Sequence, residues 1–315
     1  MRIIKSIKSL RFARVLTNLK HFHQLWANAS LYRKHGIDRK FWQPISYSAI
    51  KKHSESDLPW LDKANDKEIM KSNPQFAAFG EVLQQQLLGW CENGYLILPK
   101  FFDDGFISDL EKSVEAGLTK NQQKQYASDR VLHLHKTNEK VRQAFKDEKL
   151  LAILSFLLGK EILPFQTINF YKSSSQPAHS DAIHLTTEPL GYSLGVWIAL
   201  EDVKPGSGEF FYYPGSHKLK YIMNDDFTAG RKFMIETEDL HHKYESKIAQ
   251  IIEEKNLKAE VFLPKKGDIL IWHTNLIHGS LAKKESSLTR KSLIMHYFAK
   301  GVLCYHEMME MPAVF

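Results

Sequence analysis

The chain has 315 residues, 43% hydrophobic and 25% charged, which is the composition of a globular protein with one large domain or two. No apolar run reaches the roughly 18 residues that a membrane-spanning helix needs, and Cys91 and Cys304 are too few for a disulfide framework. These features exclude an integral membrane protein and a disulfide-stapled secreted domain, and they favour a reducing, cytoplasmic location.

Positive charge is concentrated at the N-terminus. The first 40 residues hold 10 Lys and Arg and one acid, Asp38, so they carry +9, while the whole chain carries +7 and residues 41–315 therefore carry −2. A nucleic-acid-binding protein would need basic charge across its body, so no nucleic-acid partner is expected.

Residues 1–40 are predicted to form a basic amphipathic helical segment. Basic residues recur every three or four positions and leave no continuous apolar region of the kind that a signal peptide requires. One helix face collects apolar side chains, namely Phe12, Val15, Leu16, Leu19, Phe22 and Trp26. Residues 1–35 could therefore touch the inner face of an anionic membrane, or the stripe could pack on the protein's own core or a partner subunit.

The middle of the chain is predicted to be mostly helical. Residues 41–75 mix Pro, Ser, Trp and charges without periodicity, which indicates a connector that partly wraps the body. The next expected elements are a helix at 76–94 ending at Gly94, a strand at 95–102, and helices at 103–118 and 138–159.

From about residue 160 the pattern changes to short strands. Aromatic and β-branched runs separated by turn residues occur at 162–172, 191–200, 209–214, 259–264, 267–273 and 291–299. A charged, helix-prone insertion interrupts them at about 222–258. This order predicts an α+β protein with a mainly β core, in which a helical layer packs on a barrel or sandwich; the core occupies about 160–300 of a domain at 76–315.

The stretch "QPAHSDAIH" at 176–184 indicates a metal site. In extended structure His179 and Asp181 project from the same face, and burying both is costly unless something satisfies them. His278, at the end of another strand-like run in "LIWHTNLIHGS", is the candidate third ligand. Two histidines and a carboxylate that leave coordination positions open form the facial triad of non-haem Fe(II) oxygenases.

Oxygenases of this type commonly use 2-oxoglutarate, whose distal carboxylate needs a fixed cation. Arg290, twelve residues past His278, enters the last strong strand, and its planar guanidinium can pair with a carboxylate through two hydrogen bonds. Ser280 follows His278 by two residues, so its hydroxyl faces the same side if the strand continues, and it could bind the same carboxylate.

From about residue 90 to 300 the sequence resembles the phytanoyl-CoA dioxygenase family of Fe(II)/2-oxoglutarate oxygenases. "ENGYLILPKFF" looks like the family's opening strand, "HSD" matches its His-x-Asp, and "EFFYYPGSH" looks like its strand followed by Pro-Gly-Ser-His. "IHGS" with Arg290 matches its distal histidine, serine and arginine, and Trp197 in "GVWIAL" falls where the family has a tryptophan beside the co-substrate.

The resemblance implies a double-stranded β-helix, a cupin-like jelly roll, in which His179, Asp181 and His278 bind Fe2+. Arg290 and Ser280 would hold 2-oxoglutarate, Trp197 would line the co-substrate pocket, and O2 would be the oxidant. The implied activity is hydroxylation of a C–H bond in a small-molecule, lipid or glycoconjugate substrate, with release of succinate and CO2. The alternatives are a related iron enzyme that desaturates, epimerises or cyclises, or a membrane-associated scaffold with an inactive metal site.

Strand parity predicts on which face two further histidines, His184 and His296, lie. His184 is five residues past His179 and is expected on the opposite face, so it is left out of the site. His296 is six residues past Arg290, on the same face, and is a candidate for lining the substrate cavity.

Overall fold

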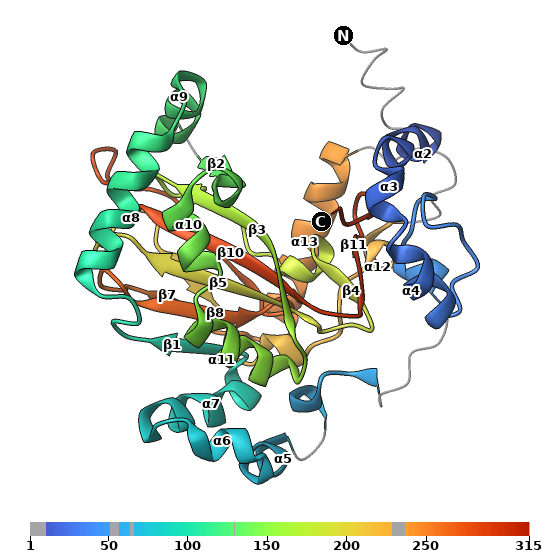
Figure 1. The fold of residues 1–315 in the computed structure, drawn as a ribbon, viewed down its shortest axis with the longest axis horizontal. Coiled ribbons are helices and arrows are strands. Elements are labelled where there is room, and N and C mark those ends of the chain that lie inside the picture. The colour runs from blue at the N-terminus through green and yellow to red at the C-terminus, as the bar shows by residue number, and fades with distance from the viewer. Residues whose placement is uncertain (1–10, 51–56, 64–65, 129, 229–236, 315) are drawn as a thin grey trace.

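Figure 1 shows the computed structural model, which describes residues 11–50, 57–63, 66–128, 130–228 and 237–314. The larger sheet has six antiparallel strands in the order β1–β8–β5–β10–β3–β2. These strands are β1 Tyr95–Leu98, β8 Ile269–His273, β5 Ser193–Ala199, β10 Ser292–Ala299, β3 Ile162–Phe170 and β2 Arg130–Leu132.

A smaller sheet packs against the inner face of the larger one. Its order is β7–β6–β9, with bounds β7 Glu260–Phe262, β6 Phe210–Tyr212 and β9 His278–Ser280. Trp197 on β5 contacts Phe262 on β7 at a ring-centroid distance of 5.6 Å, and Phe210 on β6 contacts Trp272 on β8 at 5.6 Å. The two facing sheets form the double-stranded β-helix expected from the sequence.

The central strands are buried on both faces, which explains why they contain almost no polar residues. Along β5, Leu194, Val196 and Ile198 join the core beneath the helices, whereas Trp197 and Ala199 join the core between the sheets. This alternation follows from the two-residue period of a strand.

Helices cover the outer face of the larger sheet (Figure 1). The helices of this layer and its flank are α5 Asp66–Ser72, α6 Pro74–Ala78, α7 Glu81–Asn93, α8 Asp104–Gly117, α9 Lys120–Ser128, α10 Glu139–Phe145 and α11 Glu148–Leu158. Two expected helices are each divided in the structure. Residues 76–94 separate before α7 at Gly80, and residues 138–159 separate where the Asp147 side chain accepts from the Leu150 N–H and starts α11.

The insertion expected at 222–258 contains α12 Asn224–Phe227 and α13 Thr237–Glu254. Tyr244 and Ile248 of α13 pack with Ile183 and Ile277, so this helix covers the segments that carry the metal-site residues. Both cysteines are buried and free.

The first and last described elements contact each other beside the jelly roll. A third sheet, β12–β11–β4, comprises β12 Met311–Pro312, β11 Leu303–His306 and β4 Thr186–Glu188, and it contacts α2 Arg11–Lys20 and α4 Asn28–Lys34, with α3 Phe22–Leu25 between these helices. Residues 1–10 of the expected amphipathic segment lie outside the described residues. In the part of the chain that the structure describes, no helix is both long and apolar enough to cross a membrane.

Candidate metal centre

An antiparallel bridge joins the two segments that carry the expected metal ligands. The His179 N–H donates to the His278 carbonyl at 2.8 Å, and the His278 N–H donates to the His179 carbonyl at 2.9 Å. Residues paired in this way place their side chains on the same side, and the two imidazole centroids lie 4.4 Å apart. His278 begins β9 in the smaller sheet, so it does not end the β8 run that precedes it.

The local reason given for pairing His179 with Asp181 is wrong, because the two residues do not share a strand. Asp181 begins a 3-10 helix, Asp181–Ile183, and the Ser180 hydroxyl accepts from the Ala182 N–H at this turn. The turn still directs the carboxylate toward both imidazoles. Asp181 Oδ1 lies 3.6 Å from His179 Nε2, and Asp181 Oδ2 lies 3.6 Å from His278 Nε2.

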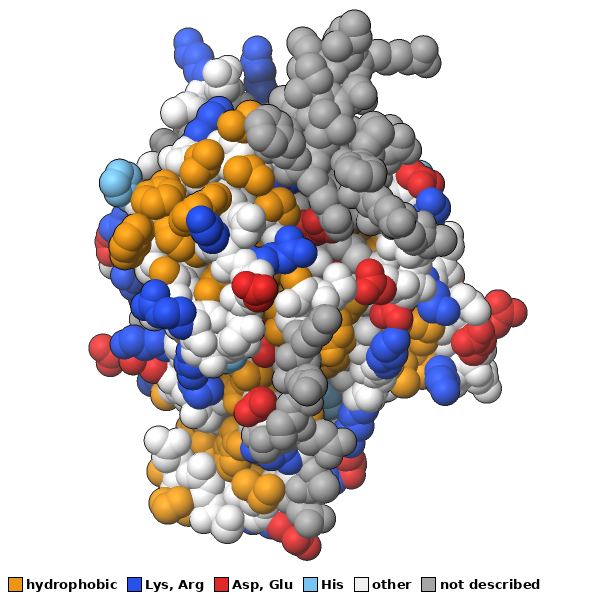
Figure 2. Space-filling view, turned by 90° about the vertical axis from the view of Figure 1, so that its right-hand side faces the viewer, with side chains coloured by type: hydrophobic (Ala, Val, Ile, Leu, Met, Phe, Trp, Pro, Cys, Tyr) orange, Lys and Arg blue, Asp and Glu red, His pale blue; other side chains and the backbone are white. Residues whose placement is uncertain are grey.

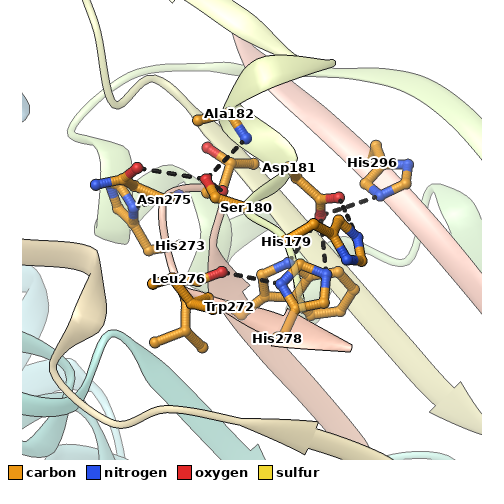
Figure 3. Close-up of polar contacts among 12 residues, drawn as sticks. His179, Ser180, Asp181, Ala182, Trp272, His273, Asn275, Leu276, His278 and His296 are labelled. Carbon is orange, nitrogen blue, oxygen red and sulfur yellow. Dashed lines mark hydrogen bonds and ion pairs between the residues drawn. The ribbon is translucent and has the colours of Figure 1, made fainter. Parts of the chain in front are cut away.

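Backbone carbonyls orient both imidazoles (Figure 3). His179 Nδ1 lies 2.8 Å from the Pro177 carbonyl, and His278 Nδ1 lies 2.9 Å from the Leu276 carbonyl. A carbonyl can only accept, so each Nδ1 carries the proton and each neutral ring keeps its lone pair on Nε2. The ligand atoms of His179, Asp181 and His278 lie within 4.8 Å of one another. This donor set, with its orienting hydrogen bonds, fits a divalent transition metal such as Fe2+.

The protonation states suit metal binding. Burial would raise the pKa of Asp181, but His278, His179 and His296 together lower it well below its usual range. Burial lowers the pKa of His278 to about 4, against the opposing effect of Asp181. Asp181 is therefore ionised and His278 neutral at pH 7, the forms that bind a metal.

Trp272, which the sequence analysis missed, fixes the Asp181 carboxylate. Its indole N–H donates to Asp181 Oδ2 at 2.9 Å. The indole lies over Gly195 of the neighbouring strand, where an added Cβ would stand 2.2 Å from the ring. Two features of the sequence could have indicated this contact: a tryptophan within the β8 run and a glycine inside the apolar β5 run.

Arg290 reaches the same cavity from the segment before β10. It is 1% exposed, and its Nη1 donates to Ser280 Oγ at 3.1 Å and to the Gly208 carbonyl at 3.2 Å. Among the described residues Arg290 forms no salt bridge, and its Nε has no hydrogen-bond partner. Burial lowers its pKa to about 10, so it stays charged at neutral pH. The charge of Glu209 acts on Arg290 but forms no salt bridge with it, and a buried guanidinium without a salt bridge is costly, which fits a site for a ligand carboxylate.

Trp197 does not line the cavity, contrary to the role that the family resemblance implied for it. It is fully buried, and the Arg290 Cζ lies 5.9 Å from its ring centroid. Trp197 therefore supports the guanidinium within the core between the sheets.

A cavity of about 520 Å³ opens at the triad, and Ser280 and Arg290 also line it. Most of the remaining wall is apolar, from Leu132, Phe165, Ile168, Phe170, Leu185, Phe210, Ile294, Phe298, Met309, Met311, Pro312, Ala313 and Val314. A cavity of this character suits a largely apolar ligand with few polar groups.

Further histidines line the cavity. His296 does so as expected, with Nε2 3.7 Å from Asp181 Oδ2. His184 was wrongly left out, because the 3-10 turn after Ser180 invalidates the parity argument. Its Nδ1 lies 3.2 Å from His306 Nε2, while His306 Nδ1 accepts from the Met309 N–H at 3.2 Å. Neutral His306 must therefore donate from Nε2 to His184.

Comparisons with known proteins agree with this geometry. Residues 90–292 match the protein-family model described as phytanoyl-CoA dioxygenase. The chain is 35% identical over 107 residues to phytanoyl-CoA dioxygenase domain-containing protein 1 of Danio rerio, a match that spans a third of each chain. It is 22% identical over 233 residues to the peroxisomal phytanoyl-CoA dioxygenase of Bos taurus, covering 65% of each.

Solved structures share the fold. The non-haem α-ketoglutarate-dependent carbocyclase SnoK from nogalamycin biosynthesis superposes with a TM-score of 0.56 at 17% identity, covering 73% of this chain and 88% of SnoK. EctD from S. alaskensis, crystallised with 2-oxoglutarate and 5-hydroxyectoine, gives 0.51 at 18% identity, covering 68% and 75%.

Proposed function

The chain belongs to the phytanoyl-CoA dioxygenase family, and on that premise we propose that it is an Fe(II)- and 2-oxoglutarate-dependent hydroxylase of a largely apolar substrate. One observation carries the proposal: three oriented metal-ligand side chains and a buried guanidinium without a salt bridge among the described residues open into one apolar cavity. Bound Fe2+, with 2-oxoglutarate and O2, would supply the oxidising chemistry, in which 2-oxoglutarate becomes succinate and CO2.

The protein's own residues would bind and orient the reactants. Backbone carbonyls keep the Nε2 lone pairs of His179 and His278 toward the metal position, and Trp272 holds one oxygen of Asp181 so that the other is free to coordinate. Arg290 and Ser280 would receive the distal carboxylate of 2-oxoglutarate. The apolar wall would exclude water and place a C–H bond of the substrate near the metal.

The first alternative, a scaffold with an inactive metal site, fits the geometry less well. An inactive site has no need of a complete set of ligands, yet both imidazoles, the ionised carboxylate and a buried guanidinium without a salt bridge among the described residues are all present. Desaturation, epimerisation or cyclisation would use the same residues. Product mass distinguishes these reactions, because only hydroxylation adds one oxygen atom to the substrate.

The test is calorimetric titration of 2-oxoglutarate into the purified protein loaded with Fe2+ without O2, followed by a succinate assay in air. We expect Arg290→Lys to weaken 2-oxoglutarate binding about tenfold or more, because lysine keeps the charge but loses the planar fork. His179→Ala should abolish succinate formation.

The matched controls are Lys291→Arg, next in sequence but paired with Glu111 and Glu115 on α8, and the exposed His242→Ala. Both should behave as wild type. Equal 2-oxoglutarate binding by wild type and Arg290→Lys, or binding that does not need the metal, would reject the proposed function.

A further inference from the structure

Helix α2 turns part of its apolar stripe away from the body of the protein. Leu16 is 50% exposed and Leu19 is 44% exposed, and Trp26, just after α3, is 62% exposed. Phe22 does pack on the body, but these three side chains are exposed, so packing on the protein's own core, one of the alternatives for the stripe, does not describe them.

The side of α2 that faces the body is polar. Asn18 is 2% exposed, and its side-chain amide donates to the Trp42 carbonyl at 3.0 Å. The Arg14 guanidinium lies 3.5 Å from the Met311 sulfur and 3.6 Å from the Met309 sulfur. A helix that only covers its own domain buries leucine and exposes asparagine and arginine, so this arrangement indicates that something else covers the leucines.

Aromatic rings and cations extend this exposed region. Phe22 contacts Trp26 at 5.7 Å and Trp42 at 5.6 Å, and the Lys40 ammonium lies 5.3 Å from the Trp42 ring centroid. The exposed charged side chains of residues 14–40 are Lys20, Arg33, Lys34, Asp38, Arg39 and Lys40, five cations and one acid. Figure 2 looks at this side of the molecule and shows hydrophobic side chains gathered with Lys and Arg around them.

Helix α2 lies between this region and the wall of the cavity. It contacts β12, and the two methionines that Arg14 touches, Met309 and Met311, both line the cavity. Whatever binds the exposed leucines is therefore separated by α2 from the apolar wall that the C-terminal residues supply.

We propose that Leu16, Leu19, Phe22, Trp26 and the cations around them form a docking surface for an anionic lipid bilayer. Apolar side chains with an aromatic ring at their edge and lysines around them are what an interfacial helix presents to anionic lipid. A second copy of the chain would bring two basic surfaces together, so the charge favours a bilayer over self-association. Resting on the proposed function, the inference extends to the substrate, which is a lipid whose acyl chain enters the cavity from the membrane.

Co-sedimentation with vesicles tests the docking surface. The full chain should bind phosphatidylcholine vesicles that contain phosphatidylserine, bind vesicles of phosphatidylcholine alone much more weakly, and lose affinity as salt rises. A variant with Leu16→Gln, Leu19→Gln and Trp26→Gln should lose about tenfold or more in partitioning, because the apolar contacts are removed while the charge is kept.

A control variant with Val82→Gln, Val261→Gln and Leu263→Gln changes side chains that are 76%, 47% and 49% exposed but lie on α7, β7 and the residues after β7. It should bind vesicles as wild type does. Equal vesicle binding by all three proteins, or no preference for the anionic vesicles, would overturn the docking surface. So would a wild-type protein that does not bind vesicles but forms a dimer that the α2–α3 variant cannot form.

Succinate release in the presence of vesicles tests the substrate class. Anionic vesicles carrying a substrate lipid pool extracted from membranes should stimulate succinate release by wild type and the control, and much less by the α2–α3 variant. Vesicle binding without stimulation would reject the lipid substrate. Calorimetric binding of 2-oxoglutarate does not involve this surface, so it decides the proposed function separately.

Discussion

At the scale of single residues, the metal centre depends on a tryptophan that cannot bind metal itself. Trp272 donates to Asp181 Oδ2, and Gly195 leaves the space that its indole occupies. The hydrogen bond holds the carboxylate in one orientation while the bridge between His179 and His278 holds the imidazoles. Residues of this kind tune metal affinity through the ligands that they orient.

We therefore expect Trp272→Phe to weaken Fe2+ binding by about 10–100-fold, because phenylalanine keeps an aromatic ring at this position but lacks the N–H donor. Titration with Mn2+ as a redox-stable probe measures the change. Trp90→Phe, at a similarly buried tryptophan of α7, is the control and should leave metal affinity unchanged. If both variants bind metal equally, the indole does not position Asp181.

Residue types and spacing were enough to predict which side chains meet, but the local backbone conformation that brings them together was not predictable. Five of the predicted side chains lie together at the cavity, namely His179, Asp181, His278, Ser280 and Arg290. They could be predicted because few other kinds of site use that set of groups in that order. The 3-10 turn after Ser180 is stabilised by tertiary contacts, so strand parity misplaced His184. The positions of Trp197 and Trp272 depend on which face of each strand lies inward, and the sequence alone does not determine that for strands buried on both faces.

At the scale of elements, the inserted helix α13 secures the loop that carries two of the metal ligands. The Tyr244 hydroxyl accepts from the Ser180 N–H at 2.9 Å and donates to the Ser180 carbonyl at 3.0 Å. Tyr244 is 2% exposed, so no solvent replaces these bonds when the hydroxyl is removed.

Tyr244→Phe should lower the free energy of unfolding by about 1–3 kcal/mol, because it leaves the buried Ser180 N–H unpaired and leaves the Ser180 carbonyl with only the 3.5 Å bond from the Ile183 N–H. It should also weaken metal binding, since His179 and Asp181 flank Ser180. Urea unfolding and Mn2+ titration measure the two effects. Tyr95→Phe removes a hydroxyl that donates to Glu260 near the surface and should cost far less. Equal losses in the two variants would contradict the role assigned to α13.

Helical periodicity predicted where helices occur, but not how they divide or which side they bury. The expected helices at 76–94 and 138–159 each separate in two at a local signal, Gly80 or the Asp147 cap, that is visible once the packing is known. The outward orientation of Leu16 and Leu19 on α2 could not be predicted, because it depends on Asn18 and Arg14 finding partners on other segments of the chain.

For the whole molecule, two kinds of buried titratable group set the pH dependence of stability: histidines with a lowered pKa and glutamic acids with a raised pKa. Burial lowers the pKa of His184 well below its usual range, that of His217 to about 3, and those of His135, His278 and His306 to about 4. Burial raises the pKa of Glu188 to about 8 and that of Glu307 to about 7.

The sign follows from which state binds more protons. Below pH about 6.5 the unfolded chain protonates these five histidines, which the folded chain keeps neutral, and this outweighs the two glutamic acids protonated only in the folded state. Between pH 8 and 6.5 only the glutamic acids differ, so the folded state gains stability as the pH falls. The metal-free protein should therefore be most stable near pH 6.5 and lose stability on both sides.

Urea unfolding of the metal-free protein between pH 5 and 8.5 measures this dependence. Each uncompensated proton contributes about 1.4 kcal/mol per pH unit, so the acid side should be the steeper. A free energy of unfolding that rises steadily from pH 8 to pH 5 would contradict the balance of buried groups.

The architecture as a whole was predictable because it depends on order and patterning. Helices followed by short aromatic strands indicated a helical layer on a jelly roll, and the family motifs occupy the segments that form β1, β6 and β9. The third sheet was not expected, since β4, β11 and β12 are short and β4 pairs with β11 across more than a hundred residues.

The central claim is that an iron site and a carboxylate clamp share one cavity. A crystal structure of the protein grown without O2 in Fe2+ and 2-oxoglutarate, with anomalous scattering recorded at the iron edge, tests it most directly. We expect one iron peak about 2.0–2.3 Å from His179 Nε2, His278 Nε2 and an oxygen of Asp181, with the distal carboxylate of 2-oxoglutarate paired to Arg290. An iron peak elsewhere, or 2-oxoglutarate bound away from Arg290, would contradict it.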